Sequence, residues 1–259
     1  LFGLKTINLK PLTAPIMNIT SLQDKLNKLF ASDSLKARAA LGGLWLGTGN
    51  GVEQLLRFVR NMILTRILAP EAFGVMAIVH AVNTAFESFT EIGIRQAIIQ
   101  NPRGHETTYL NGAWFFSCAR SCLLYIMTFT GAPYIARFYN DPALTLLLRI
   151  AFLTILFNGL VSADAYLAVK KMRFGRWALA WHGGSIVGII ATIILSFYMR
   201  NVWALVIGFT SEAAVRLVLS YVLFPFVPRF AFDRDHLRSL LKFSRGMFGL
   251  PILTFIFLR

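Results

Sequence analysis

The chain has 259 residues, of which 56% are hydrophobic and 15% are charged, and its mean hydropathy is +0.61. Soluble domains carry about 25% charged residues, so this composition excludes an ordinary soluble protein and indicates an integral membrane protein. The net charge of +14 would suit a nucleic-acid-binding protein, but the basic residues fall between apolar segments, as in the cytoplasmic loops of membrane proteins, and we therefore expect no nucleic-acid partner.

Residues 1–40 are expected to form a cytoplasmic segment that contains an amphipathic helix. Apolar residues recur at helical spacing between Leu22 and Phe30, with lysines between them. This pattern suits a helix at the membrane interface and equally an exposed soluble helix. The chain begins with Leu and stops inside an apolar run, so we expect a piece of a longer protein, with Met17 as a candidate start.

Residues 41–227 contain six apolar segments, each long enough for the roughly 20 residues that cross a bilayer. Short connections rich in Pro, Asn, Asp and Gly separate them, which makes neighbouring helices antiparallel. Residues 228–259 read as a cytoplasmic loop and the beginning of a seventh helix. We therefore predict an all-α, polytopic transmembrane helix bundle. The segments are Leu41–Leu68, Phe73–Ile99, Tyr109–Ile135, Leu144–Val169, Trp177–Met199 and Val202–Val227.

The distribution of basic residues predicts the orientation of the bundle. If the N-terminus is cytoplasmic, sixteen Lys and Arg residues fall in the inside regions and four in the outside loops. Such an excess on one side is typical of cytoplasmic loops, and we expect a multi-pass protein with a cytoplasmic N-terminus. Two glycine series at four-residue spacing, Gly43-Gly47-Gly51 and Gly184-Gly188, predict closely packed helices.

Five acidic and five basic residues lie within the six segments. An ionised residue at the centre of a membrane helix costs about 2.5–3.5 kcal/mol, so these side chains must face one another or water. We favour a hydrated central cavity because so many segments contribute, while ion pairs that join helices are the alternative. The ten residues are Glu53, Arg57, Arg60, Glu87, Glu91, Arg95, Arg120, Asp164, Glu212 and Arg216.

Motifs for catalysis or for a cofactor are missing from the sequence. Cys118 and Cys122 share a helix face with no further ligand nearby, so we expect packing residues and no metal site. No Gly-x-x-x-x-Gly-Lys phosphate loop and no nucleophile–base–acid arrangement occur. We therefore expect a transporter of a polar solute that needs no cofactor, and no enzyme.

Four stretches resemble a known family in their order and spacing: residues 67–74 (ILAPEAFG), 91–100 (EIGIRQAIIQ), 168–174 (AVKKMRF) and 241–251 (LKFSRGMFGLP). They are similar to the polysaccharide transporter family, the oligosaccharide flippases of the multidrug/oligosaccharidyl-lipid/polysaccharide exporter superfamily. The resemblance covers roughly Ser34 to Arg259. It implies that the chain is the N-terminal lobe of a flippase built from two six-helix lobes.

The same resemblance implies a function in the cell inner membrane. The substrate would be an undecaprenyl-diphosphate-linked oligosaccharide, flipped for lipopolysaccharide, O-antigen or exopolysaccharide assembly. A polysaccharide polymerase and glycosyltransferases are the protein partners that we expect. Two alternatives stay open: a multidrug extrusion antiporter of the same superfamily, which the five Arg residues disfavour, and a membrane assembly factor or inactive truncated fragment.

A lipid diphosphate requires cationic ligands. Arg suits this task because its guanidinium group forks onto phosphate oxygens and stays charged when desolvated. We rank Arg60 first, because Glu53 partly neutralises Arg57, and we place Arg57, Arg95 and Arg216 after it. The alternative is that these last three only pair with the acidic residues four positions before them.

Transport in one direction needs a coupling or gating group. Asp164 is our first candidate, because no basic residue lies four positions from it in its own segment. Glu87 and Glu91 are the competitors. A hydrogen bond from Asp164 to a neighbouring helix is the alternative explanation.

Overall fold

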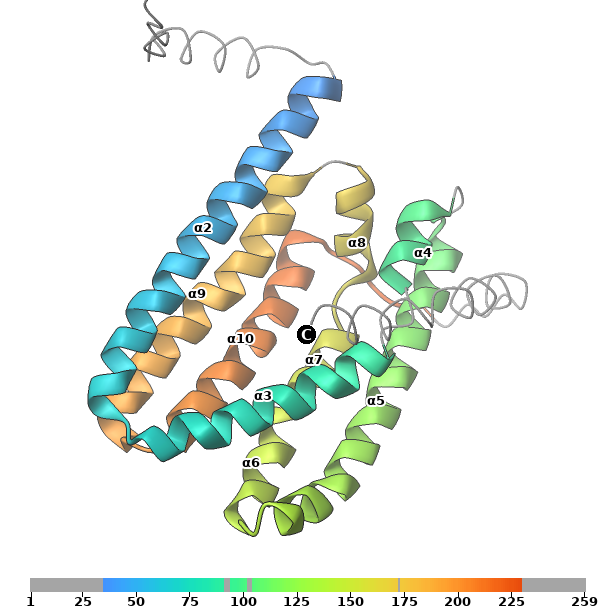
Figure 1. Cartoon of the computed structure of the whole chain (residues 1–259). Helices are drawn as coiled ribbons and strands as arrows, with labels where there is room; N and C mark the ends of the chain where they lie inside the picture. The colour runs from blue at the N-terminus through green and yellow to red at the C-terminus, as the bar shows by residue number, and fades with distance from the viewer. Residues whose placement is uncertain (1–34, 91–93, 102–103, 172, 230–259) are drawn as a thin grey trace, which may run out of the picture.

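A computed structural model describes residues 35–90, 94–101, 104–171 and 173–229, and these form a bundle of helices (Figure 1). No strand occurs within these ranges, which confirms the predicted all-α class. The expected interfacial helix and the beginning of the seventh helix lie outside the described residues. The helices are α2 (Leu35–Ile67), α3 (Pro70–Thr90), α4 (Ile94–Gln100), α5 (Thr107–Phe138), α6 (Ala143–Ala151), α7 (Leu153–Gly159), α8 (Ala163–Lys170), α9 (Phe174–Met199) and α10 (Val202–Leu223).

Three long helices, α2, α9 and α10, lie side by side (Figure 1). Helices α9 and α10 form a hairpin, because Arg200 adopts a left-handed conformation with φ of 48° and ends α9. The side chain of Asn201 then accepts a hydrogen bond from the backbone N–H of Trp203, at 3.1 Å, and caps the start of α10. Arg200 and Asn201 thus form one of the short connections expected between the apolar segments.

Glycines decide how closely these helices approach. A Cβ atom on Gly188 of α9 would lie 2.6 Å from the Cβ of Glu212 on α10, and one on Gly49 of α2 would lie 2.6 Å from the imidazole of His182 on α9. The predicted close packing at Gly184 and Gly188 is confirmed. Gly43, Gly47 and Gly51 differ from the prediction: a Cβ on any of them would meet nothing within 4 Å in the described part of the chain.

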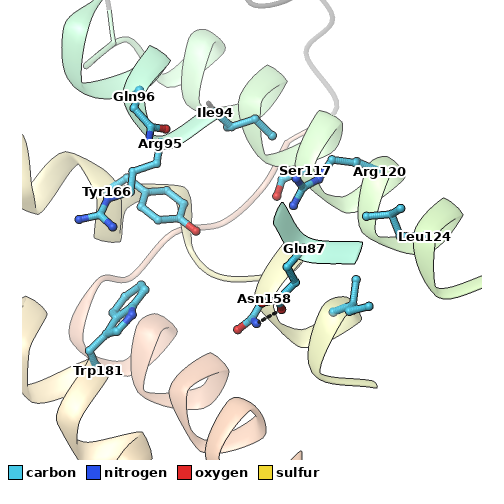
Figure 2. A pocket seen from close by; sticks show the side chains of 11 residues that line it. Glu87, Ile94, Arg95, Gln96, Ser117, Arg120, Leu124, Asn158, Tyr166 and Trp181 are labelled. Carbon is cyan, nitrogen blue, oxygen red and sulfur yellow. Dashed lines mark hydrogen bonds between the residues drawn. The ribbon is translucent and has the colours of Figure 1, made fainter. Parts of the chain in front are cut away.

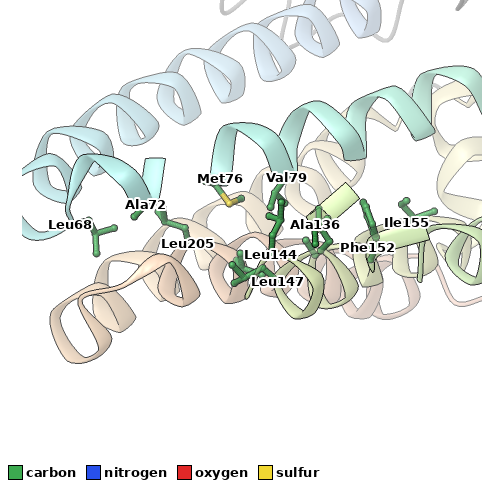
Figure 3. Packing of buried hydrophobic residues seen from close by; sticks show 14 of the residues in the cluster. Leu68, Ala72, Met76, Val79, Ala136, Leu144, Leu147, Phe152, Ile155 and Leu205 are labelled. Carbon is green, nitrogen blue, oxygen red and sulfur yellow. The ribbon is translucent and has the colours of Figure 1, made fainter. Parts of the chain in front are cut away.

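One apolar core lies among several of the helices (Figure 3). Side chains of α3, α5, α6, α7 and α10 meet there, and Val79, Leu148 and Phe152 are fully buried. Helix α3 packs against α6 and α10, and α5 packs against α6 and α7. This core fixes α3 across the bundle. The labelled core residues are Leu68, Ala72, Met76, Val79, Ala136, Leu144, Leu147, Phe152, Ile155 and Leu205.

Two of the predicted spans are divided in the structure. The fourth, Leu144–Val169, consists of α6, α7 and α8. The unit formed by α6 and α7 (Ala143–Gly159) makes an angle of 57° with α8 (Ala163–Lys170). The second, Phe73–Ile99, is shared by α3 and α4, while residues 91–93 are outside the described part. Helix α2 begins at Leu35, so the predicted boundary between residues 40 and 41 falls inside it.

Among the described helices, α5, α9 and α10 are long and apolar enough to cross a membrane, and the bent α6–α8 unit is a fourth candidate. Helix α2 has 33 residues but carries Glu53, Arg57 and Arg60, which lower its hydropathy. Membrane crossing by α2 and α3 therefore stays a prediction. Figure 1 shows at which end of the bundle the connections lie. The ends of α4 and α8 lie together at one end, where the Lys170 ammonium donates to the carbonyl of Asn101. The α5–α6 and α9–α10 turns lie at the opposite end.

Candidate functional site

A network of charged side chains connects α2, α9 and α10. Arg57 Nη2 lies 2.8 Å from Glu53 Oε1 on its own helix and 3.0 Å from Glu212 Oε1 on α10. Arg216 Nη2 lies 2.8 Å from the same Glu212 oxygen. His182 Nδ1 of α9 lies 2.7 Å from Glu53 Oε2. The side chains are only 12–30% exposed, so the network is largely buried.

Polar and aromatic side chains of α9 support this network. Ser185 donates its hydroxyl to Glu212 Oε1 at 2.9 Å. The indole rings of Trp177 and Trp181 stack with centroids 4.6 Å apart. The guanidinium of Arg95 lies 5.3 Å from the Trp177 ring, and that of Arg216 lies 5.6 Å from the Trp181 ring, so each cation faces an aromatic surface.

The network borders a pocket of about 310 Å³, here called the charge pocket. A smaller cavity of about 40 Å³, the small pocket, adjoins it and shares Arg57 and Glu212 with it. The polar and aromatic residues of the charge pocket are Asn50, Glu53, Arg57, Arg95, Phe174, Trp177, Trp181, His182, Ser185, Glu212 and Arg216. Both expectations for the ionisable residues have a counterpart here: an ion pair, Arg57–Glu212, joins α2 to α10, and charged side chains line pockets between helices. Hydration of these pockets stays a prediction.

Arg60 has a different environment from Arg57 and Arg216. Its Nε and Nη2 atoms donate to the side-chain oxygen of the adjacent Asn61, at 3.2 and 3.0 Å. Within the described residues no carboxylate forms an ion pair with Arg60, although it lines the small pocket beside Arg57. Arg57 is shared by two carboxylates. The predicted pairs Glu53–Arg57 and Glu212–Arg216 are present, and Glu91, the expected partner of Arg95, lies outside the described residues.

A second polar pocket, of about 250 Å³, lies between α3, α4, α5, α7, α8 and α9 (Figure 2). Glu87 projects into it and accepts a hydrogen bond from Asn158 Nδ2 at 3.0 Å. Arg95 and Trp181 line both this pocket and the charge pocket, so the two are neighbours. The lining residues are Glu87, Ile94, Arg95, Gln96, Ser117, Arg120, Leu124, Ile155, Asn158, Tyr166 and Trp181.

Asp164, our first candidate for the coupling or gating group, lies outside these pockets. It sits half-buried in the first turn of α8 and lines none of the three pockets described above. Of the two coupling candidates that the structure describes, Glu87 is the one that shares a pocket with arginines, Arg95 and Arg120, while Glu91 lies outside the described residues. Within the described residues no group of three His, Cys, Asp or Glu is placed to hold a metal ion.

Sequence reasoning missed four contributors to the site: Trp177, Trp181, His182 and Ser185. On α9 a four-residue spacing separates Trp177, Trp181 and Ser185, so these three share one face of that helix. This spacing was the available signal. The contact of His182 with Glu53 has no comparable signal, because 129 positions separate the two residues.

The profile of the polysaccharide biosynthesis protein family matches residues 63–259. The chain belongs to this family. The chain is 30% identical over 202 residues to the "Succinoglycan biosynthesis transport protein ExoT" of Rhizobium meliloti (strain 1021), an alignment that covers 78% of this chain and 40% of that protein. It is 22% identical over 190 residues to a "membrane protein in cps region" of Klebsiella pneumoniae, covering 73% and 39%. No solved structure matches the chain significantly.

The chain thus spans about 40% of the length of the curated relatives that it matches. Its apolar helices and its similarity to these relatives support a multi-pass membrane protein. Arg95, Glu87, Glu212 and Arg216 lie within the range that the family profile matches. Arg57 and Arg60 precede that range.

Proposed function

We propose that the full-length protein flips an undecaprenyl-diphosphate-linked oligosaccharide across the inner membrane, with the N-terminus in the cytoplasm. The relative named as a succinoglycan biosynthesis transport protein supports transport in polysaccharide biosynthesis. The flipped product would serve exopolysaccharide, lipopolysaccharide or O-antigen assembly, with a polysaccharide polymerase and glycosyltransferases as partners.

The charge of the two connected pockets carries this proposal. Four arginines and two glutamates line the charge pocket and the small pocket, which leaves a net formal charge of +2 with the histidines neutral. A diphosphate diester carries one negative charge on each phosphate, so the head group would balance this excess. The planar guanidinium fork of arginine also binds two oxygens of one phosphate at once.

Within this site Arg60 is the principal ligand for the diphosphate. Glu53 and Glu212 neutralise most of the charge on Arg57 and Arg216, whereas Arg60 forms its hydrogen bonds with the neutral amide of Asn61. Moving from that amide to a phosphate replaces a neutral acceptor with a charged one, which makes a stronger hydrogen bond. The positive electrostatic field at the site also has contributions from Arg57, Arg95 and Arg216.

The test uses the full-length protein in proteoliposomes loaded with an undecaprenyl-diphosphate-linked oligosaccharide. We expect Arg60→Ala to slow flipping strongly and the Arg57→Ala/Arg60→Ala double variant to abolish it, at normal levels of inserted protein. Arg66→Ala is the matched control, because Arg66 is an exposed cation in the last turn of the same helix and lines none of these pockets. Wild-type flipping by the double variant would exclude the site. Export of organic cations without any flipping would instead favour a multidrug extruder.

A further inference from the structure

The second polar pocket combines charges of both signs with several neutral polar and aromatic side chains. Its carboxylate and its cations lie on different helices: Glu87 comes from α3, Arg95 from α4 and Arg120 from α5. An anion in this space would face Glu87, and a cation would face the two guanidinium groups. A neutral solute with many hydroxyl groups avoids both conflicts.

The lining supplies both hydrogen-bond donors and acceptors, and a hydroxyl group can use both. Asn158 and the arginines supply N–H donors, while Glu87 and Ser117 supply acceptor oxygens (Figure 2). The side-chain oxygen of Gln96 is buried and has no hydrogen-bond partner among the described residues. A buried acceptor of this kind is normally satisfied, and a ligand hydroxyl would satisfy it.

Aromatic rings complete the lining. Tyr166 of α8 and Trp181 of α9 lie with their centroids 6.4 Å apart and their planes tilted by 60°. Trp181 also stacks on Trp177, which fixes the orientation of its indole. A sugar ring has apolar C–H faces and a polar hydroxyl rim, so it can cover an aromatic face while its rim forms hydrogen bonds. At about 250 Å³ the pocket is smaller than the roughly 300–1,000 Å³ typical of drug-sized ligands, so its capacity suits one sugar ring.

We propose that the second polar pocket binds a sugar residue of the substrate while the charge pocket, with Arg60 reaching it from the small pocket, holds the diphosphate. This inference rests on the proposed flippase function, which it deepens by assigning a site to the glycan. Trp181 and Arg95 border both pockets, so a sugar bonded directly to the diphosphate can enter one pocket while the phosphates occupy the other. Specificity for the glycan then resides in Tyr166, Asn158 and Gln96.

The experiment measures equilibrium binding of two probes to the full-length protein in nanodiscs: undecaprenyl diphosphate without sugar, and undecaprenyl diphosphate that carries one hexose. The wild type should bind the hexose-bearing lipid about ten-fold more tightly, since two or three hydrogen bonds separate the probes. Tyr166→Ala and Asn158→Ala should remove this preference and leave the affinity for the sugar-free lipid unchanged. Tyr198→Ala, which removes an exposed tyrosine that lines none of these pockets, should preserve both affinities.

The outcomes separate the two proposals. If the wild type binds neither lipid, the proposed function is wrong and the glycan site falls with it. If the wild type binds both lipids equally, or if both variants keep the preference, the glycan site alone is wrong. A variant that loses affinity for the sugar-free lipid has a damaged fold. Gln96→Met, which keeps the side-chain volume and removes the buried acceptor oxygen, then decides: loss of the preference supports the glycan site, and its retention refutes it.

Discussion

Glu212 is the residue whose loss should most disturb the bundle. One of its oxygens accepts hydrogen bonds from Arg57 at 3.0 Å, from Arg216 at 2.8 Å and from Ser185 at 2.9 Å. The Glu212→Gln substitution keeps the shape but removes the negative charge between two guanidinium groups. Arg216 would then lack an ion-pair partner among the described residues, while Arg57 would keep Glu53.

The expected destabilisation follows from this burial. Removal of one partner from a buried ion pair costs about 3–5 kcal/mol. Glu212 is 12% exposed, Arg216 is 18% exposed and Arg57 is 30% exposed, so solvent screens part of the interaction. We therefore expect Glu212→Gln to lower the free energy of unfolding by about 2–4 kcal/mol. The additional change Arg216→Met should recover part of this loss, because it removes the uncompensated cation.

The free energy of unfolding can be measured on the full-length protein by SDS titration in mixed micelles. Glu71→Gln is the matched control, since Glu71 is an exposed carboxylate in the first turn of α3, and its effect should stay within about 0.5 kcal/mol. A loss near 0.6 kcal/mol for Glu212→Gln is the average of one side-chain hydrogen bond between membrane helices. Such a small loss would refute the claim that the Glu212 carboxylate compensates the charges of two arginines. Equal stability of the single and double variants would refute the role of Arg216.

Three further changes test the packing, the orientation and the coupling group. Gly188→Ala should separate α9 from α10 and cost about 1–3 kcal/mol in the same SDS titration, whereas Gly47→Ala should cost nothing because a Cβ there meets no atom within 4 Å in the described part of the chain; equal effects would contradict the close packing. In a variant without native cysteines, Lys171→Cys should react with an impermeant thiol reagent only from the cytoplasmic side and Arg137→Cys only from the periplasmic side; the reverse pattern would overturn the orientation. Asp164→Asn should slow flipping and flatten its pH dependence if this residue couples transport, and an unchanged pH profile would reject that role.

Contacts within one helix were predictable from the sequence. Glu53 and Arg57 are four residues apart, as are Glu212 and Arg216, and helical geometry places such pairs on one face. Both ion pairs are present at 2.8 Å. The same geometry could not predict that Arg57 also reaches Glu212, because that contact spans 155 positions and depends on the order in which helices pack. Gly49, Gly184 and Gly188 bring α2 and α10 against α9, and periodicity alone does not say which helix fills the space beside a glycine.

The break between α7 and α8 was hidden from the sequence for another physical reason. Residues 144–169 are apolar almost throughout, so hydropathy predicts one continuous span. A break inside a membrane exposes backbone groups that must find partners within the protein. Ser162 finds them at the end of α10: its N–H donates to the Ser220 hydroxyl at 3.1 Å, and its own hydroxyl donates to the Phe224 carbonyl at 2.9 Å. These partners lie about 60 positions away, so the break is stable only once α10 is in place. The resulting bend redirects α8 and places Tyr166 at the second polar pocket, so the feature that hydropathy could not detect is the one that builds the proposed glycan site.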